Sequence, residues 1–213
     1  MKKLFVCMFV LTLACSTTLL AAEAPKVAHA DHIIQGKAQP NTSHDPVLCN
    51  TIGPSTNEFQ LNGYFVAGPD NSLLGESQFM AVACTPSKNV TLTTVKAGWQ
   101  WYGYGANLIQ ICLYSDNGSN APGTQIGNCV TKRNLPDFGT ANTLVTVNFS
   151  SQSLALTAGT QYWIVGQTPS SGTGDDAVDV WNGGGEYTGY NVAGSGWGSF
   201  QADLTPAATI SGK

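Results

Sequence analysis

The chain has 213 residues and a mass of 22.3 kDa, a length that favours a single domain. Charged residues make up only 10% of it and glycines number 24, so the composition is poor in helix formers and rich in turn formers. This composition argues against a helical bundle, a coiled coil and an α/β nucleotide enzyme, and a hydrophobic share of 42% argues against general disorder.

Residues 1–30 are typical of a secretory signal peptide. Two lysines open the segment, and the apolar run that follows is too short and lacks the flanks of a membrane span. Two cleavage sites compete: Ala28-His29-Ala30 forms an A-x-A site, and cleavage after Ala22 is the alternative. Lipid attachment at Cys15 is a weaker alternative, because Thr12 stands where a lipobox has an aliphatic residue.

Removal of residues 1–30 would leave six basic and twelve acidic residues, a formal charge of −6. Nucleic acids and anionic membranes are bound by clusters of Lys and Arg, and the longest such cluster here is Lys132-Arg133. The sequence therefore predicts no nucleic-acid partner and no membrane insertion after signal removal. It predicts a secreted, periplasmic or cell-surface location.

The remainder divides into a polar leader, residues 31–57, and a β domain, residues 58–213. Within the β domain, Val145, Val147 and Phe149 share one strand face because strand side chains alternate with a period of two. Expected strands recur about every ten residues between Gly, Pro and Asn turns, whereas residues 168–200 are expected to be loop-like. This pattern predicts an all-β, antiparallel β-sandwich. The main expected strands cover residues 58–61, 77–82, 90–99, 109–114, 124–130, 144–149, 161–165 and 207–210.

Four cysteines remain after the signal segment, and an even number in an exported chain implies disulfides. The number alone permits three pairings. Residues 109–130 are typical of a hairpin, which would place Cys112 opposite Cys129 and leave Cys49 to pair with Cys84. A zinc site is disfavoured, because the chain has no C-x-x-C pair and both histidines of the mature chain, His32 and His44, lie near its N-terminal end.

Four segments, in order, resemble the bacterial choice-of-anchor R type of secreted or surface domain. They are residues 79–82, residues 90–95, the run Tyr114-Ser115-Asp116-Asn117-Gly118 with Pro122-Gly123, and the run Leu156-Thr157-Ala158-Gly159-Thr160-Gln161-Tyr162-Trp163. The resemblance covers roughly residues 75–210 and implies a jelly-roll-like sandwich on the outside of the cell, without an established activity. The family's C-terminal anchor has no counterpart in the last residues, Ser211-Gly212-Lys213.

The run Trp99-Gln100-Trp101-Tyr102-Gly103-Tyr104 is the first candidate for ligand binding. In a strand the two tryptophans would face one way and Gln100 and Tyr102 the other, so one set fills the core and the other meets solvent. Exposed aromatic rings suit stacking on sugars or contact with a protein. Four further aromatic candidates lie in the glycine-rich C-terminal part: Trp181, Tyr187, Tyr190 and Trp197.

Carboxylates beside these aromatic residues give a possible Ca²⁺ site, because Ca²⁺ prefers oxygen ligands. Asp175, Asp176 and Asp179 are the candidates, with a solvated loop as the simpler interpretation. A second possible site uses Asp116 and Asn117, where an ordinary Asx turn is the favoured alternative. No other cofactor is predicted.

The residues needed for catalysis do not form a recognisable set. A Ser-His-Asp site needs a positioned histidine, the mature cysteines are expected to be paired, and no spacing identifies a glycosidase carboxylate pair. We therefore expect a non-catalytic extracellular or cell-surface protein with a structural or adhesive role. A carbohydrate-binding module is the alternative and a glycosidase a distant one; the expected partner is an extracellular glycan or a surface protein.

Overall fold

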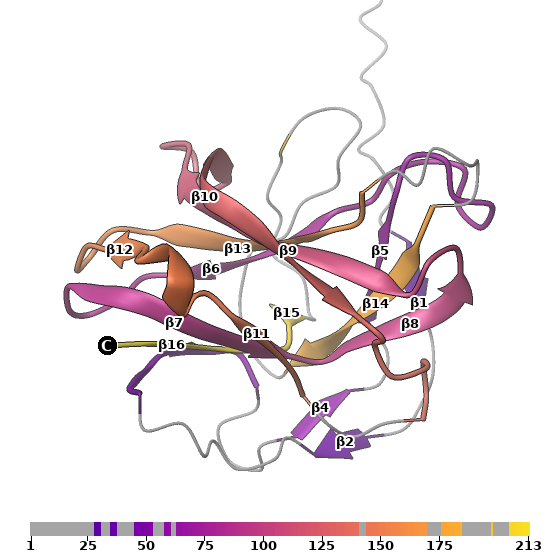
Figure 1. Ribbon diagram of the computed structural model, residues 1–213, viewed down its shortest axis with the longest axis horizontal. Helices are drawn as coiled ribbons and strands as arrows, with labels where there is room; N and C mark the ends of the chain where they lie inside the picture. Colours follow the sequence, from indigo (N-terminus) through magenta and orange to yellow (C-terminus); the bar gives the residue numbers. More distant parts are fainter. Residues whose placement is uncertain are drawn as a thin grey trace, which may run out of the picture.

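The computed structural model describes residues 28–30, 35–37, 45–52, 58–60, 63–140, 144–169, 176–184, 197 and 205–213. These residues form a nearly all-β structure in which every paired strand is antiparallel to its neighbour (Figure 1). The expectation of an all-β, antiparallel sandwich is confirmed.

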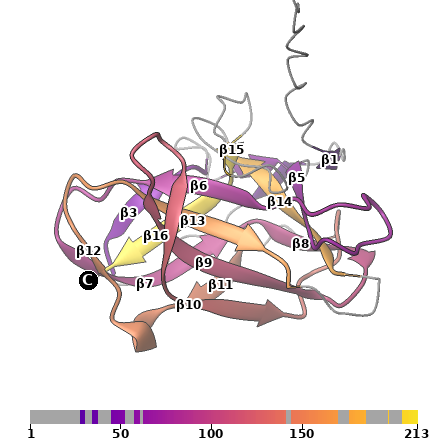
Figure 2. The same cartoon turned by 90° about the horizontal axis from the view of Figure 1, so that it is seen from above.

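Three sheets build the body of the molecule, and we name each by its two central strands. The β5–β14 sheet runs β1 (His29–Ala30), β5 (Gly63–Ala67), β14 (Val178–Gly184), β15 (Thr205–Pro206), with β8 (Trp99–Tyr104) also paired to β14. The β9–β13 sheet runs β10 (Pro122–Arg133), β9 (Leu108–Asp116), β13 (Tyr162–Gln167), β6 (Met80–Cys84), which lie side by side in Figure 2. The β7–β16 sheet runs β11 (Val145–Asn148), β7 (Val90–Ala97), β16 (Ala208–Gly212), β3 (Val47–Asn50), with β12 (Ala155–Leu156) also paired to β7.

Two smaller elements complete the described part of the chain. A separate two-stranded ribbon consists of β2 (Gln35–Lys37) and β4 (Glu58–Gln60). A short 3₁₀ turn, η1 (Ser150–Gln152), connects β11 to β12.

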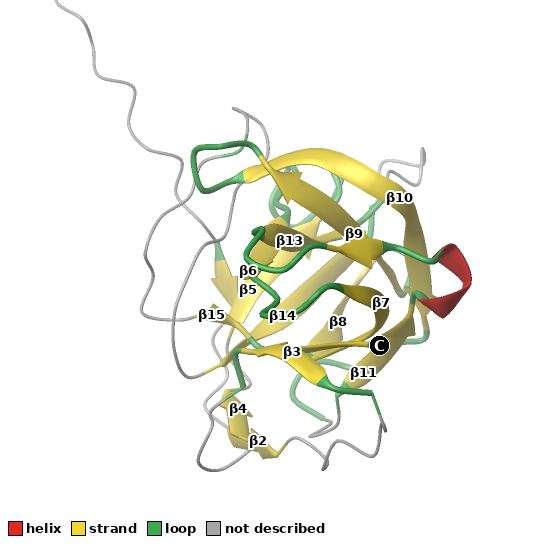
Figure 3. Ribbon diagram, turned by 90° about the vertical axis from the view of Figure 1, so that its left-hand side faces the viewer, coloured by secondary structure: helices red, strands yellow, loops and turns green. Residues whose placement is uncertain are grey.

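The β5–β14 and β7–β16 sheets meet at a corner. Only Gly98 separates β7 from β8, and only Ala207 separates β15 from β16, so both chain segments pass directly from one sheet to the other. The Gly98 amide donates to the Ala207 carbonyl at 3.3 Å, which ties the two crossing points together. The strands consequently curl around a common interior (Figure 3).

The core fills this interior with side chains from all three sheets. Its members include Val82 and Ile111 from the β9–β13 sheet, Val95 from the β7–β16 sheet, and Trp99 and Trp181 from the β5–β14 sheet. The period-two prediction for residues 145–149 is also confirmed. Val145, Val147 and Phe149 are buried, and the two residues between them are exposed.

Both disulfides have the predicted pairing. Cys112 in β9 is bonded to Cys129 in β10, across the predicted hairpin. Cys49 in β3 is bonded to Cys84 in β6, which joins the β7–β16 sheet to the β9–β13 sheet. Disulfides are typical of an oxidising extracellular environment. Among the described residues, no helix has the length and apolar character to cross a membrane.

Two segments differ from the sequence-based expectation. Residues 178–184 were expected to be loop-like, but they form β14, the strand that joins β5 to β8. The sequence pattern conceals this strand, because a carboxylate stands where a strand with one buried face has an apolar residue. Asp179 occupies the same inward face as Trp181. Part of the expected polar leader also enters a sheet, since β3 pairs with β16.

Removal of the two disulfides should destabilise the protein unequally. Replacing Cys49 and Cys84 together by alanine should lower the free energy of unfolding by about 4 kcal/mol, and replacing Cys112 and Cys129 by about 3 kcal/mol. The first bond closes the longer loop, with partners 35 residues apart against 17. Urea unfolding of both double variants under non-reducing conditions measures the two losses, and a larger loss for the hairpin pair would contradict this account.

Candidate functional site

The strand β8 separates its aromatic residues onto two faces. Trp99 and Trp101 stand at odd-numbered positions of the strand and face the core. Trp99 is fully buried and Trp101 is half-buried. Tyr102 and Tyr104 lie at even-numbered positions, and Tyr104 has 37% of its surface exposed. The predicted alternation is therefore present, with the tryptophans turned inward.

Trp99 and Trp181, both candidates for ligand binding in the sequence, are core residues in the structure. Their rings meet edge to face, with centroids 5.2 Å apart, and neither has exposed surface. The Trp181 indole N–H donates to the Ala207 carbonyl at 3.0 Å, while Gly166 leaves room for the ring, because a Cβ there would lie 3.0 Å from it. Burial agrees with the core role that the strand pattern allowed for Trp99 and removes Trp181 from the exposed candidates: both side chains hold the sheets together.

Tyr102 is the centre of an aromatic cluster on the outer face of the β5–β14 sheet. Its ring centroid lies 4.8 Å from that of Phe65, in an edge-to-face contact, and 5.2 Å from that of Phe138. The Tyr104 ring centroid lies 6.2 Å away, and the planes of the two tyrosine rings are inclined by only 13°. We call these four residues the Tyr102 surface, in which Phe65 is buried beneath the partly exposed rings of the other three. The sequence indicated the two tyrosines but not Phe138, an isolated aromatic residue in a turn-rich segment.

Backbone contacts along Trp101 bring Phe138 to this surface. The Trp101 amide donates to the Pro136 carbonyl at 2.9 Å, and the Phe138 amide donates to the Trp101 carbonyl at 2.8 Å. The Trp101 indole N–H donates to the Tyr104 carbonyl at 2.8 Å. The half-buried tryptophan therefore positions the neighbours of Tyr102, so it supports the surface from behind.

Gly105 fixes the direction in which the chain leaves the Tyr102 surface. Its φ is +57°, and a Cβ at this position would lie 2.5 Å from the backbone of Asp176. A side chain here would be strained and would collide with that backbone. The end of β8 is consequently held against the start of β14.

Trp197 lies away from the Tyr102 surface. It is half-buried on the outer face of the β9–β13 sheet and meets Tyr114 edge to face at 6.0 Å. Burial raises the pKa of the Tyr114 hydroxyl above its ordinary value. Tyr187 and Tyr190, the other two aromatic candidates, lie outside the described residues.

Asp116 and Asn117 form the Asx turns that the sequence favoured. The Asp116 carboxylate accepts from the Gly118 amide at 3.0 Å and from the Trp163 indole at 3.3 Å, and Asn117 Oδ1 accepts from the Ser119 amide at 2.7 Å. These hydrogen bonds use the oxygens that a cation would need. The pair has a structural role in closing the β9–β10 turn.

Asp176 and Asp179 are both buried, which differs from the exposed loop expected for them. Asp176 Oδ2 accepts from the Asp70 amide at 2.9 Å and packs against Gly68. Asp179 faces inward from β14, opposite Val66 in β5 and Trp101 in β8, and neither of its oxygens has a hydrogen-bond partner. Asp175 lies outside the described residues, and the described ones contain no group of three metal-ligating side chains.

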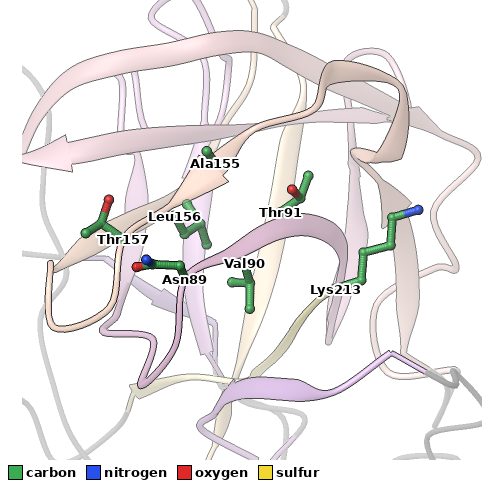
Figure 4. Close-up of a pocket in the computed structure, with 7 residues that line it drawn as sticks. All are labelled: Asn89, Val90, Thr91, Ala155, Leu156, Thr157 and Lys213. Carbon is green, nitrogen blue, oxygen red and sulfur yellow. The ribbon is translucent and has the colours of Figure 1, made fainter.

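A pocket of about 410 Å³ lies at the other end of the molecule, between β12, the start of β7 and the C-terminal residue (Figure 4). Asn89 and Thr157 lie together in it, and the Lys213 ammonium points away from them. The Asn89 side-chain oxygen already accepts from the Ala158 amide at 2.8 Å. None of the site candidates selected from the sequence lines this pocket, which combines amide, hydroxyl and ammonium groups with the apolar side chains of Val90, Ala155 and Leu156.

Comparisons with protein-family models, with curated proteins and with solved structures found no match to this chain. The functional argument consequently depends on the side chains themselves.

Asp179 should make stability depend on pH. Burial raises the pKa of its carboxyl well above the ordinary value, so the folded state holds a proton that the unfolded state releases. The stability that this proton contributes is fully present below the pKa of the unfolded state. It is lost as the pH rises toward the pKa of the folded state, and the free energy of unfolding falls by up to about 1.4 kcal/mol per pH unit. Relative to the wild type, Asp179→Asn should therefore gain stability steadily as pH is raised above about 4.

Denaturant unfolding across a pH series measures this difference. Asp179→Ala is the matched control, because it should change the slope in the same way while adding a pH-independent cavity loss. Parallel curves for the wild type and Asp179→Asn would contradict a raised pKa for this buried carboxyl.

Proposed function

We propose that the protein is exported and acts, without catalysis, as an extracellular or cell-surface binding module with a structural or adhesive role. Three features support the proposal: the signal-like N-terminus, the two disulfides, and an acidic chain with few basic residues. One disulfide joins two sheets, and the other joins the two strands of a hairpin. The resemblance to choice-of-anchor R domains favours the same role. The proposal includes removal of the signal peptide, by cleavage after Ala30 or after Ala22.

The observation that carries the proposal is the Tyr102 surface. Tyr104 is one of only two large hydrophobic residues exposed in the described part of the chain, and it stacks on a second tyrosine that is itself half-exposed. Tyrosine combines a flat apolar ring with a polar edge, which is why it is enriched at recognition surfaces. The supporting strand is held on its inner face by the fully buried Trp99 and the half-buried Trp101, so little ordering is required on binding.

A glycan is the ligand class that the two tyrosines favour. Tyr102 and Tyr104 present near-parallel rings, inclined by 13°, from alternate positions of one strand. The apolar faces of sugar rings stack on such rings, while their hydroxyls reach the polar edges. The burial of Trp99 and Trp181 excludes these two rings from such stacking.

A glycosidase is the less favoured alternative. Asp176 and Asp179 are both buried, and neither lines the pocket beside β12. A hydrolytic pair needs two carboxyl groups that flank a cleft and reach the substrate. Catalysis is therefore not part of the proposal.

Retention on insoluble polysaccharides tests the proposal directly. Against a panel, with and without a chelator, we expect specific retention that Tyr102→Ala and Tyr104→Ala each weaken by roughly five-fold, because each removes a stacking ring worth about 1 kcal/mol. Val47→Ala is the control, since Val47 is exposed but lies on β3 in another sheet. Loss of retention in chelator would add a Ca²⁺ requirement.

Two results would count against this version of the proposal. Retention that survives both tyrosine substitutions would show that the Tyr102 surface is not the binding site. Absence of retention across the panel would overturn the glycan version and direct the search to protein partners, with the same variants tested for capture.

A further inference from the structure

The N-terminal strand β1 is built into the edge of the β5–β14 sheet. His29 is paired with Tyr64 and Ala30 with Gly63, and the Phe65 amide donates to the Ala28 carbonyl at 3.3 Å. The segment thereby covers part of the edge of β5, whose amides and carbonyls would otherwise be unpaired.

Gln78 holds this segment with its side chain. The Gln78 side-chain nitrogen, Nε2, donates to the Ala28 carbonyl and to the Phe65 carbonyl, both at 2.9 Å. The side-chain oxygen, Oε1, accepts from the Ala28 backbone amide at 2.8 Å. It therefore binds both backbone groups of Ala28, as a neighbouring strand would. Gln78 is 3% exposed, and buried amides are stable only when such bonds are made.

The side chains of the segment fit an apolar seat. Ala30 is 2% exposed and belongs to a buried cluster with Phe65, Ala67 and Val178, against which Ala28 packs from the edge. A residue with so little exposed surface leaves no room for a larger side chain. The alternating small residues of the A-x-A motif therefore match this seat.

We propose that Ala28–Ala30 is a permanent strand of the functional protein and that the signal is removed upstream of it, by hydrolysis of the peptide bond after Ala22. Cleavage after Ala30 would remove both partners of Gln78 in Ala28, leave its amide with one of three hydrogen bonds, and expose the edge of β5. The A-x-A motif serves as a strand held by Gln78 rather than as the processing site. The assignment of the cleavage site depends on the export that we propose above.

The N-terminus of the exported protein distinguishes the possibilities. Intact-mass measurement and N-terminal sequencing of protein from the culture medium or periplasm should give a chain that begins at Glu23. A chain that begins at Asp31 would overturn the inference while leaving export intact. An exported chain that keeps its first residues would contradict the assigned cleavage, whereas absence of the protein from both fractions would contradict export.

A second experiment tests the strand without any export. A chain that begins at Glu23 should melt several degrees above one that begins at Asp31, and a synthetic peptide of residues 23–33 should restore the difference when added to the shorter chain. The same peptide with Ala30→Leu is the matched control and should not restore it. Equal melting temperatures, or equal rescue by both peptides, would overturn the inference.

Hydrogen exchange covers the case in which the shorter chain does not fold. In the chain that begins at Glu23, the Phe65 amide should be protected, because it donates to Ala28, and Ala30→Asp should remove that protection while distant strands such as β9 stay protected. An unprotected Phe65 in the wild-type chain would overturn the inference.

Discussion

The packing of Trp99 against Trp181 is the interaction on which the rest of the structure depends. The two rings come from β8 and β14, which are paired strands, and both belong to the core shared with the β9–β13 sheet, where Gly166 makes room for the Trp181 ring. Large aromatic side chains dominate core energetics because each buries so much apolar surface. Once these rings point inward, the two-residue period of β8 places Tyr102 on the outer face. An irregularity in the pairing after Trp101 then brings Tyr104 opposite Val178, which belongs to the cluster on that face. The candidate recognition surface is thus a consequence of the core.

The same strand pair holds a buried carboxyl that works against folding at neutral pH. Asp179 lies one inward position before Trp181 and has no hydrogen-bond partner. Burying an ionised carboxylate without a partner is costly, so burial raises the pKa of this carboxyl, and an amide side chain there would stabilise the fold above the ordinary carboxyl pKa. The surrounding core, with its tryptophans and two disulfides, tolerates this loss.

Sequence reasoning succeeded where apolar alternation and turn residues agreed. Val145, Val147 and Phe149 faced the core as expected, and the hairpin with Cys112 and Cys129 formed around its Asx turn. It failed for β14, because Asp179 occupies a core-facing position and the flanking glycines are typical of a loop. It also could not show which face of β8 is buried, since both faces carry aromatic residues. That choice depends on contacts with Trp181, about 80 positions further along the chain, which local patterns do not contain.

Two segments near the N-terminus also depend on contacts with residues far along the chain, which local sequence patterns do not contain. Residues 28–30 match a cleavage motif, and nothing local distinguishes an alanine to be cut from an alanine to be buried. The distinction comes from Gln78, whose side chain binds the backbone of Ala28 across 50 positions. Likewise β3, inside a polar segment, is recruited by pairing with β16 and by the bond from Cys49 to Cys84.

Hydroxyl-radical footprinting read by mass spectrometry tests most directly whether β8 divides its aromatic residues between core and surface. It reports the solvent access of tryptophan and tyrosine side chains in one experiment on the native protein. The account predicts rapid labelling of Tyr104, slower labelling of Tyr102, and labelling of Trp99 and Trp181 only after unfolding. Native labelling of either tryptophan, or protection of Tyr104, would contradict it.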